Sequence, residues 1–161
     1  MSAPVLRHVV EAFYQALESA CAQRDLAKIA PFLHKDVEWT INGPVDVLTF
    51  CGTRYGRAAV LDLIARVAPT TVRIKAFKRD ELLVDGDRAA ALIRLTGMHT
   101  GTGAIISYRL AQFMRFCDNQ VVEFRAIIDS FDAAEQVLGR PIELTPGAQR
   151  GEDAQGDIVT V

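Results

Sequence analysis

The stretch TVRIKAFKRDELLVDGDRAAALIRLTGMHTGTGAIISYRLAQFMRFCDNQVVEFRAIID, which runs from Thr71 to Asp129, decides the fold of this chain. Apolar and polar side chains alternate along much of it, and this period of two is typical of strands that bury one face. Turn sequences interrupt the alternation at residues 85–87, 100–103 and 118–119. The pattern predicts about four antiparallel strands joined by tight turns. The last three of them are expected at residues 88–99, 104–117 and 120–129.

Apolar residues at helical spacing come before and after these strands. One early strand, 37–41, ends at the turn sequence Asn42-Gly43-Pro44 and is followed by a glycine-rich loop, 42–56. Helices followed by clustered strands indicate the α+β class, in which the helices cover one face of the sheet. The helices are expected at residues 5–21, 25–33, 57–67 and 131–138.

Composition predicts one globular domain in this chain of 161 residues, because hydrophobic residues make up 50% of it. The net charge is −2 and charges of both signs are interspersed, so the basic stripe typical of nucleic-acid-binding proteins is missing. No apolar stretch is long enough to cross a bilayer, and the N-terminus lacks the pattern of a signal peptide. We therefore expect a cytoplasmic protein without nucleic-acid or membrane partners.

The domain itself is expected to cover residues 1–139. The remaining residues, 140–161, are rich in Pro, Gly and charge, and we expect them to form a tail that docks on the domain or on a partner subunit.

The cysteines and histidines favour neither a disulfide nor a metal site. Cys21, Cys51 and Cys117 are odd in number and stand among apolar neighbours, so we interpret them as small buried side chains. The three histidines form no pair at the spacing of metal ligands on a helix. We expect no metal and no other cofactor.

Three segments share their order and spacing with a known group of proteins. They are residues 13–39, with Phe13-Tyr14 and Val37-Glu38-Trp39, the helix entry Gly56-Arg57-Ala58-Ala59-Val60, and the stretch from Val121 to Asp132. The chain thereby resembles the nuclear-transport-factor-2-like (NTF2-like) superfamily, in particular its SnoaL-like and ketosteroid-isomerase-related branch. The resemblance implies a cone-shaped fold, with three N-terminal helices packed on a strongly curved, mostly antiparallel sheet and a short closing helix. It also implies a cavity for a hydrophobic small molecule and a homodimer formed through the outer sheet face.

The resemblance to ketosteroid isomerases extends to only part of their equipment. That chemistry needs a carboxylate base and an oxyanion hole made by a Tyr and a protonated Asp. Tyr14 could supply the first donor, but Gln112 stands in the place of the Asp. No acid occurs at Trp39-Thr40, where the base is expected.

Two other branches of the superfamily point to Asp129. The run Asp129-Ser130-Phe131-Asp132 is similar to the Asp-x-Phe-Asp pattern of limonene-epoxide hydrolases, but Arg94-Leu95-Thr96 has Thr in place of their second acid. A SnoaL-like polyketide cyclase needs only one carboxylate base, and Asp129 near Trp39 could supply it, because desolvation makes a carboxylate a stronger base. The chain is therefore interpreted as a cyclase-, isomerase- or hydrolase-type enzyme, or as a non-catalytic ligand-binding or scaffold protein of the same fold.

Asp129 also has a structural interpretation as the N-cap of the closing helix. Strict alternation places it on the face of Glu123 and Arg125, opposite Phe124. A position inside the cavity therefore requires a bulge at residues 126–128.

The candidate ligand-binding residues lie on the first helix, the early strand and the long hairpins. Gln112 shares strand parity with Tyr108 and with apolar neighbours, which predicts that both point inward. Tyr14 and Trp39 could instead be core residues, Arg94 could face water, and His99 could be exposed beside its glycine-rich turn. The full set is Tyr14, Trp39, Arg94, Thr96, His99, Tyr108 and Gln112.

Overall fold

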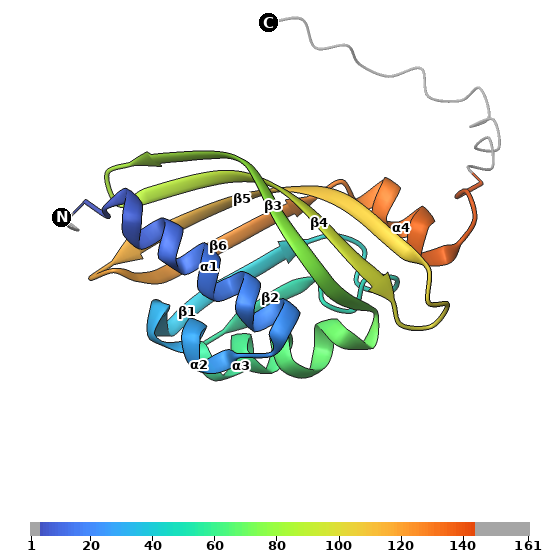
Figure 1. The fold of residues 1–161 in the computed structure, drawn as a ribbon, viewed down its shortest axis with the longest axis horizontal. Helices are drawn as coiled ribbons and strands as arrows, with labels where there is room; N and C mark the ends of the chain where they lie inside the picture. The colour runs from blue at the N-terminus through green and yellow to red at the C-terminus, as the bar shows by residue number, and fades with distance from the viewer. Residues whose placement is uncertain (1–3, 144–161) are drawn as a thin grey trace, which may run out of the picture.

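The structure is a computed structural model of the chain, and it describes residues 4–143. Six strands form one curved sheet in the order β2-β1-β6-β5-β4-β3 (Figure 1). β1 and β6 run parallel, and the other neighbouring strands run antiparallel. The strands are β1 Leu33–Asn42, β2 Gly52–Tyr55, β3 Val72–Asp85, β4 Arg88–His99, β5 Ile105–Cys117 and β6 Gln120–Ile128.

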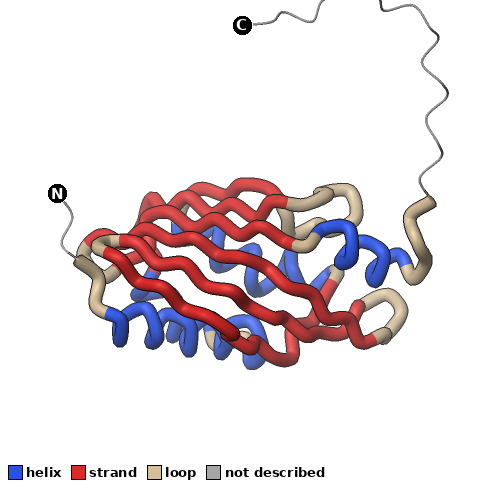
Figure 2. The backbone as a smooth tube through the Cα atoms, turned by 90° about the horizontal axis from the view of Figure 1, so that it is seen from above, coloured by secondary structure: helices blue, strands red, loops and turns tan. Residues whose placement is uncertain are grey.

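Three helical segments cover one face of this sheet, and a fourth follows β6 at the end of the sheet (Figure 2). The helices are α1 Arg7–Gln23, α2 Leu26–Ile29, α3 Arg57–Asp62 and α4 Ser130–Leu138. A 3₁₀ turn, Ala30–Phe32, extends α2, and a single π turn, Leu63–Val67, followed by a 3₁₀ turn, Ala68–Thr70, extends α3. The π turn interrupts the helix predicted at 57–67, and such turns occur often where a helix borders a functional site.

α1 forms where apolar residues recur every three or four positions, and it packs against α2 and β3. Val10, Phe13, Leu17 and Ala20 are buried on its inner side. Phe13 meets Phe116 of β5 edge to face, with ring centroids 6.2 Å apart. The core therefore lies between the helices and the concave face of the sheet.

The α+β class, the mostly antiparallel sheet and the tight hairpins agree with the prediction, but the sheet has one more strand than expected. The expected loop at 42–56 contains β2, which pairs antiparallel with β1. β1 also pairs with β6 in parallel, so the sheet is mixed and has six strands. Alternation identifies a strand but not its neighbour, which is why the sequence did not indicate this pairing.

Bulges bend the sheet around the helices. The register of β3 against β4 shifts between Ile74 and Ala76 and again between Arg79 and Glu81. Gly97 of β4 lies beside the first shift, where an added Cβ would come within 2.6 Å of Val72 Cγ1. A glycine is therefore needed for the close approach of β3 at the bend.

The predicted boundary at residue 139 follows the end of α4 at Leu138, and most of the predicted tail, residues 144–161, lies outside the described residues. Within residues 4–143, no helix is both long and apolar enough to cross a membrane.

Candidate functional site: an apolar cavity under the helices

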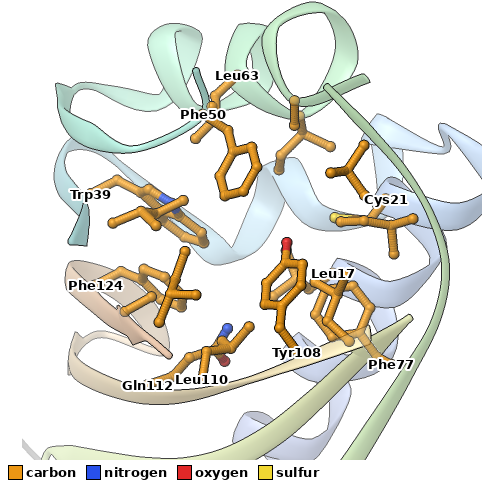
Figure 3. A pocket seen from close by; sticks show the side chains of 18 of the residues that line it. Leu17, Cys21, Trp39, Phe50, Leu63, Phe77, Tyr108, Leu110, Gln112 and Phe124 are labelled. Atoms are coloured by element: carbon orange, nitrogen blue, oxygen red, sulfur yellow. The ribbon is translucent and has the colours of Figure 1, made fainter. Parts of the chain in front are cut away.

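A cavity of about 90 Å³ lies between the concave sheet face and the helices (Figure 3). Its walls come from every strand except β2, from α1, from the loop after β1 and from the segment that follows α3. The lining residues are Leu17, Cys21, Trp39, Ile41, Phe50, Leu63, Ile64, Ala68, Pro69, Val72, Ile74, Phe77, Leu95, Tyr108, Leu110, Gln112, Phe124, Ala126 and Ile128.

Strand parity explains how the sheet supplies its part of the lining. On β5 the residues Tyr108, Leu110 and Gln112 alternate with residues that face outward, and on β6 Phe124, Ala126 and Ile128 do the same. The bulge in β3 changes the parity after Ile74, so Phe77 lines the cavity and Ala76 is exposed. Strict alternation from Val72 and Ile74 would continue to Ala76, and the bulge moves the inward position to Phe77.

Three polar side chains stand in this otherwise apolar lining, and all three are almost fully buried. Trp39 is 3% exposed, while Tyr108 and Gln112 are each 4% exposed. Trp39 Nε1 and Gln112 Oε1 have no hydrogen-bond partner among the described residues. The hydroxyl of Tyr108 likewise makes no hydrogen bond to any residue of the described chain, and it points into the middle of the cavity (Figure 3). Buried polar groups are normally paired, so two buried unpaired atoms, Trp39 Nε1 and Gln112 Oε1, on the lining of one cavity are unusual.

None of the cavity groups is charged at neutral pH. Burial raises the pKa of Tyr108 well above its usual value, and the nearby thiols of Cys51 and Cys21 raise it further. Burial also raises the pKa of the Cys21 thiol to about 12. The lining given by the described residues contains no Asp, Glu, Lys, Arg or His. Among residues 4–143 the cavity lining therefore has neutral donors and acceptors and no acid–base pair.

Phe50 forms part of the wall and is fixed by the loop that carries it. The guanidinium of Arg54 donates hydrogen bonds to the carbonyl oxygens of Phe50 at 3.2 Å, Cys51 at 3.1 Å and Thr49 at 3.4 Å. The hydroxyls of Thr49 and Thr71 lie 2.7 Å apart and tie the loop to the start of β3. These bonds make the loop a fixed wall of the cavity.

Several of the lining residues were not predicted as site residues from the sequence. Leu17, Cys21 and Leu63 belong to the apolar faces of helical segments, and Phe50 belongs to a loop. The helical periodicity shows that such residues are buried, but it does not separate cavity walls from solid core.

Asp129 lies outside the cavity. It follows the last residue of β6, its side chain is exposed, and it forms no capping hydrogen bond. The register of β6 on β5 is regular through Ala126, Ile127 and Ile128, so the bulge required to turn Asp129 inward is missing there. Its backbone does join α4, because the amide of Ala133 donates to the Asp129 carbonyl oxygen at 3.0 Å. Strict alternation therefore gives the observed position, and the epoxide-hydrolase pattern does not.

Four further candidates also lie away from the cavity. Tyr14 is buried beneath Arg79, whose guanidinium carbon is 5.4 Å from the centre of the ring, and its hydroxyl has no partner among the described residues. Arg94 and Thr96 stand at positions of β4 whose side chains point away from the core. Arg94 pairs with Asp80 at 3.6 Å, and the hydroxyl of Thr96 lies 3.3 Å from that of Ser107. His99 contacts the hydroxyl of Thr102 at 2.9 Å in the β4–β5 turn. The structure thus brings together Trp39, Tyr108 and Gln112 of the predicted set.

Nowhere in the described part of the chain do three or more His, Cys, Asp or Glu side chains gather in a way that could hold a metal ion.

Comparison with known proteins agrees with this architecture. The model of the SnoaL-like domain matches residues 10–124. None of the curated protein sequences gives a significant match. A solved structure from Rhodopseudomonas palustris, provisionally named an isomerase, is 34% identical over 84% of this chain and 100% of that chain, with a TM-score of 0.76.

Two NTF2-like proteins show the same fold at lower identity. One, of unknown function, from Burkholderia pseudomallei is 25% identical over 81% of this chain and 93% of its own, with a TM-score of 0.66. The other, from Burkholderia thailandensis, is 22% identical over 86% of this chain and 98% of its own, with a TM-score of 0.68. The chain therefore belongs to the SnoaL-like domain family within the NTF2-like superfamily.

Proposed function

We propose that this protein binds a small, uncharged and largely apolar molecule in the cavity under its helices. One observation carries the proposal: the polar groups of Trp39 and Tyr108, which have no partner among the described residues, and the amide of Gln112 belong to the lining of a single apolar cavity. Leaving a buried donor or acceptor unpaired costs about 1–3 kcal/mol, so a ligand that pairs even one of them gains affinity. Ligand sites typically have this composition, with an apolar wall and a few polar groups that set orientation.

Binding is favoured over acid–base catalysis because a carboxylate base is missing from the described lining. The Rhodopseudomonas relative is provisionally named an isomerase, and a cyclase or isomerase that moves a proton needs a base within hydrogen-bond reach of its substrate. Asp129 is exposed beyond the end of β6, and the other candidate groups of the cavity are neutral. A ligand-binding protein of the SnoaL-like fold accounts for these features without a catalytic residue.

The size of the cavity limits the ligand to a compact molecule. About 90 Å³ is below the range of about 300–1,000 Å³ that drug-sized ligands occupy. It is closer to the scale of the engineered apolar cavities that take up benzene. We propose a ligand about the size of one substituted aromatic ring.

Filling the cavity tests the proposal. Ala126 is 3% exposed and lines the cavity, so Ala126→Leu places three more carbon atoms in the ligand space. We expect cumene to raise the melting temperature of the wild-type protein and to have little effect on this variant, since only a ligand of the folded state shifts unfolding. Ala76→Leu, at an exposed position of β3, is the matched control and should respond to cumene like the wild type. Equal cumene responses of all three proteins would remove the cavity as the binding site.

We also propose that two copies associate through the outer face of the sheet. Leu83, Phe113 and Ile127 are 67%, 50% and 49% exposed there and line a shallow groove. The same groove contains Arg88 and Arg125 together with acidic Asp85 and Glu123. A surface that carries positive and negative side chains around an apolar centre can complement a second copy of itself across a two-fold axis.

A further inference from the structure

The polar groups that line the cavity differ in what they can offer a ligand. The indole of Trp39 can only donate a hydrogen bond through Nε1, whereas the hydroxyl of Tyr108 can donate or accept. Gln112 turns its amide nitrogen toward the interior and its oxygen away from it (Figure 3). The lining therefore offers a ligand two neutral donors, the indole of Trp39 and the hydroxyl of Tyr108.

Tyr108 holds the central place among these donors. It comes from the middle strand of the long hairpins, and its ring stands between the wall of α1 and the wall formed by Trp39 and Phe124 (Figure 3). Burial and the neighbouring thiols keep its pKa high, so the hydroxyl retains its proton. No described residue accepts that proton in a hydrogen bond.

We propose that Tyr108 donates a hydrogen bond to a carbonyl-type oxygen of an uncharged ligand, so that the cavity selects carbonyl compounds over hydrocarbons of the same shape. This inference rests on the proposed function, because it names the group of the ligand that the cavity recognises. A ketone, aldehyde, ester or quinone oxygen accepts from Tyr108 and brings no donor that would need its own partner.

Other ligand classes fit these groups less well. An anion would lose its hydration beside a lining that has no Lys, Arg or His among the described residues, and that loss is large for an unpaired charge. An alcohol that donates to the Tyr108 oxygen leaves the Tyr108 proton unpaired. An alcohol that accepts from Tyr108 brings a proton of its own, which needs a second acceptor in the cavity. A hydrocarbon pairs none of the three groups.

Two probes of similar size separate the hydrogen bond from hydrophobic binding. Acetophenone carries a carbonyl oxygen, and cumene replaces that oxygen with a methyl group. Their dissociation constants can be measured by NMR titration for the wild type, for Tyr108→Phe and for Tyr14→Phe. Tyr14→Phe is the matched control, because it also removes a buried and unpaired hydroxyl, but from a residue that does not line the cavity.

We expect Tyr108→Phe to raise the dissociation constant of acetophenone about tenfold, as the loss of one net hydrogen bond predicts, and to leave the dissociation constant of cumene unchanged. Tyr14→Phe should leave both constants unchanged. The Tyr108→Phe variant should fold at least as stably as the wild type, since the change removes an unpaired hydroxyl and leaves no partner behind.

Different failures have different meanings in this experiment. Equal effects of Tyr108→Phe on the two probes, or no effect on acetophenone, would overturn the role of Tyr108 while binding in the cavity stands. An equal loss of acetophenone affinity in Tyr14→Phe would also overturn it. Failure of the wild type to bind either probe would instead remove the proposed function.

Discussion

The indole of Trp39 stacks on the ring of Phe124 across the parallel pair of β1 and β6, with ring centroids 3.6 Å apart and an angle of 7° between the planes. The pair forms one wall of the cavity, and both residues are almost fully buried. The stack joins the strand that follows α2 to the strand that precedes α4, so it links packing to the shape of the site.

Replacing Phe124 with Leu should therefore affect stability more than a similar change at the surface. Phe124→Leu removes the stacked partner and leaves a small void, and we expect a loss of about 1–2 kcal/mol in the free energy of unfolding. Denaturant titration measures it, and Phe131→Leu, at a ring that is 49% exposed, is the control. Equal losses in the two variants would contradict the structural role of the stack.

Arg54 should control ligand affinity although it does not line the cavity. Arg54→Gln removes hydrogen bonds to three carbonyls of the loop that holds Phe50 in place. We expect cumene affinity to fall about threefold to tenfold as that wall loosens. Arg66→Gln breaks the exposed pair of Arg66 with Asp62 and should leave affinity unchanged. Unchanged affinity in Arg54→Gln would show that the loop is held by other contacts.

Asp129 should be dispensable for binding. Its carboxylate is exposed and lies beyond the inner face of β6. Asp129→Asn should keep the wild-type affinity for acetophenone, and its stability should stay within about 0.5 kcal/mol, as is usual for surface changes. A loss of affinity greater than tenfold would place this residue in the site and revive the interpretation as a base.

The thiol of Cys21, a half-buried residue that lines the cavity, should make stability sensitive to alkaline pH. Burial raises its pKa from 9.0 to about 12, so the folded state holds the proton more tightly than the unfolded state. The contribution of this thiol to the free energy of unfolding is fully present below pH 9. It is lost as the pH rises toward 12, with a slope of about 1.4 kcal/mol per pH unit.

The stability difference between the wild type and Cys21→Ala isolates this effect. It should stay constant from pH 6 to pH 8 and should move steadily in favour of the alanine variant above pH 9. Urea unfolding at each pH measures the difference. A difference that is independent of pH up to 10.5 would mean that the thiol is solvated in the folded protein.

Self-association through the outer face makes a separate prediction. Phe113→Glu places a charge at the centre of the apolar groove, where an interface would have to desolvate it, and should give a monomer. Tyr55→Glu, at a residue of β2 that is 71% exposed, should remain a dimer. Light scattering after size-exclusion chromatography gives the mass of each variant, and a monomeric wild type would remove the proposal.

The parts of the fold that depend on local pattern could be predicted from the sequence. The β3–β4, β4–β5 and β5–β6 turns fall where glycine and asparagine interrupt the alternation, and β4 occupies the expected residues 88–99. Strand parity was also sufficient to predict that Tyr108 and Gln112 point inward, because the pairing of β4 with β5 is regular along its length.

The parts that depend on distant contacts could not be predicted. Nothing local shows that β1 pairs in parallel with β6, or that a bulge after Ile74 moves Phe77 into the cavity. Asp129 lies outside the cavity, as the regular alternation of β6 places it, and the short motif shared with relatives did not indicate this position. The cavity exists because the side chains of the helices and the sheet leave space between them, and the periodicity of the sequence does not predict such a space.

Intermolecular NOEs from bound cumene show where on the protein the ligand lies. We expect NOEs to the methyl groups of Leu17, Ile64 and Ile128, which line the cavity from three different elements. NOEs to Leu83 and Ile127 of the outer groove in their place would contradict binding in the cavity.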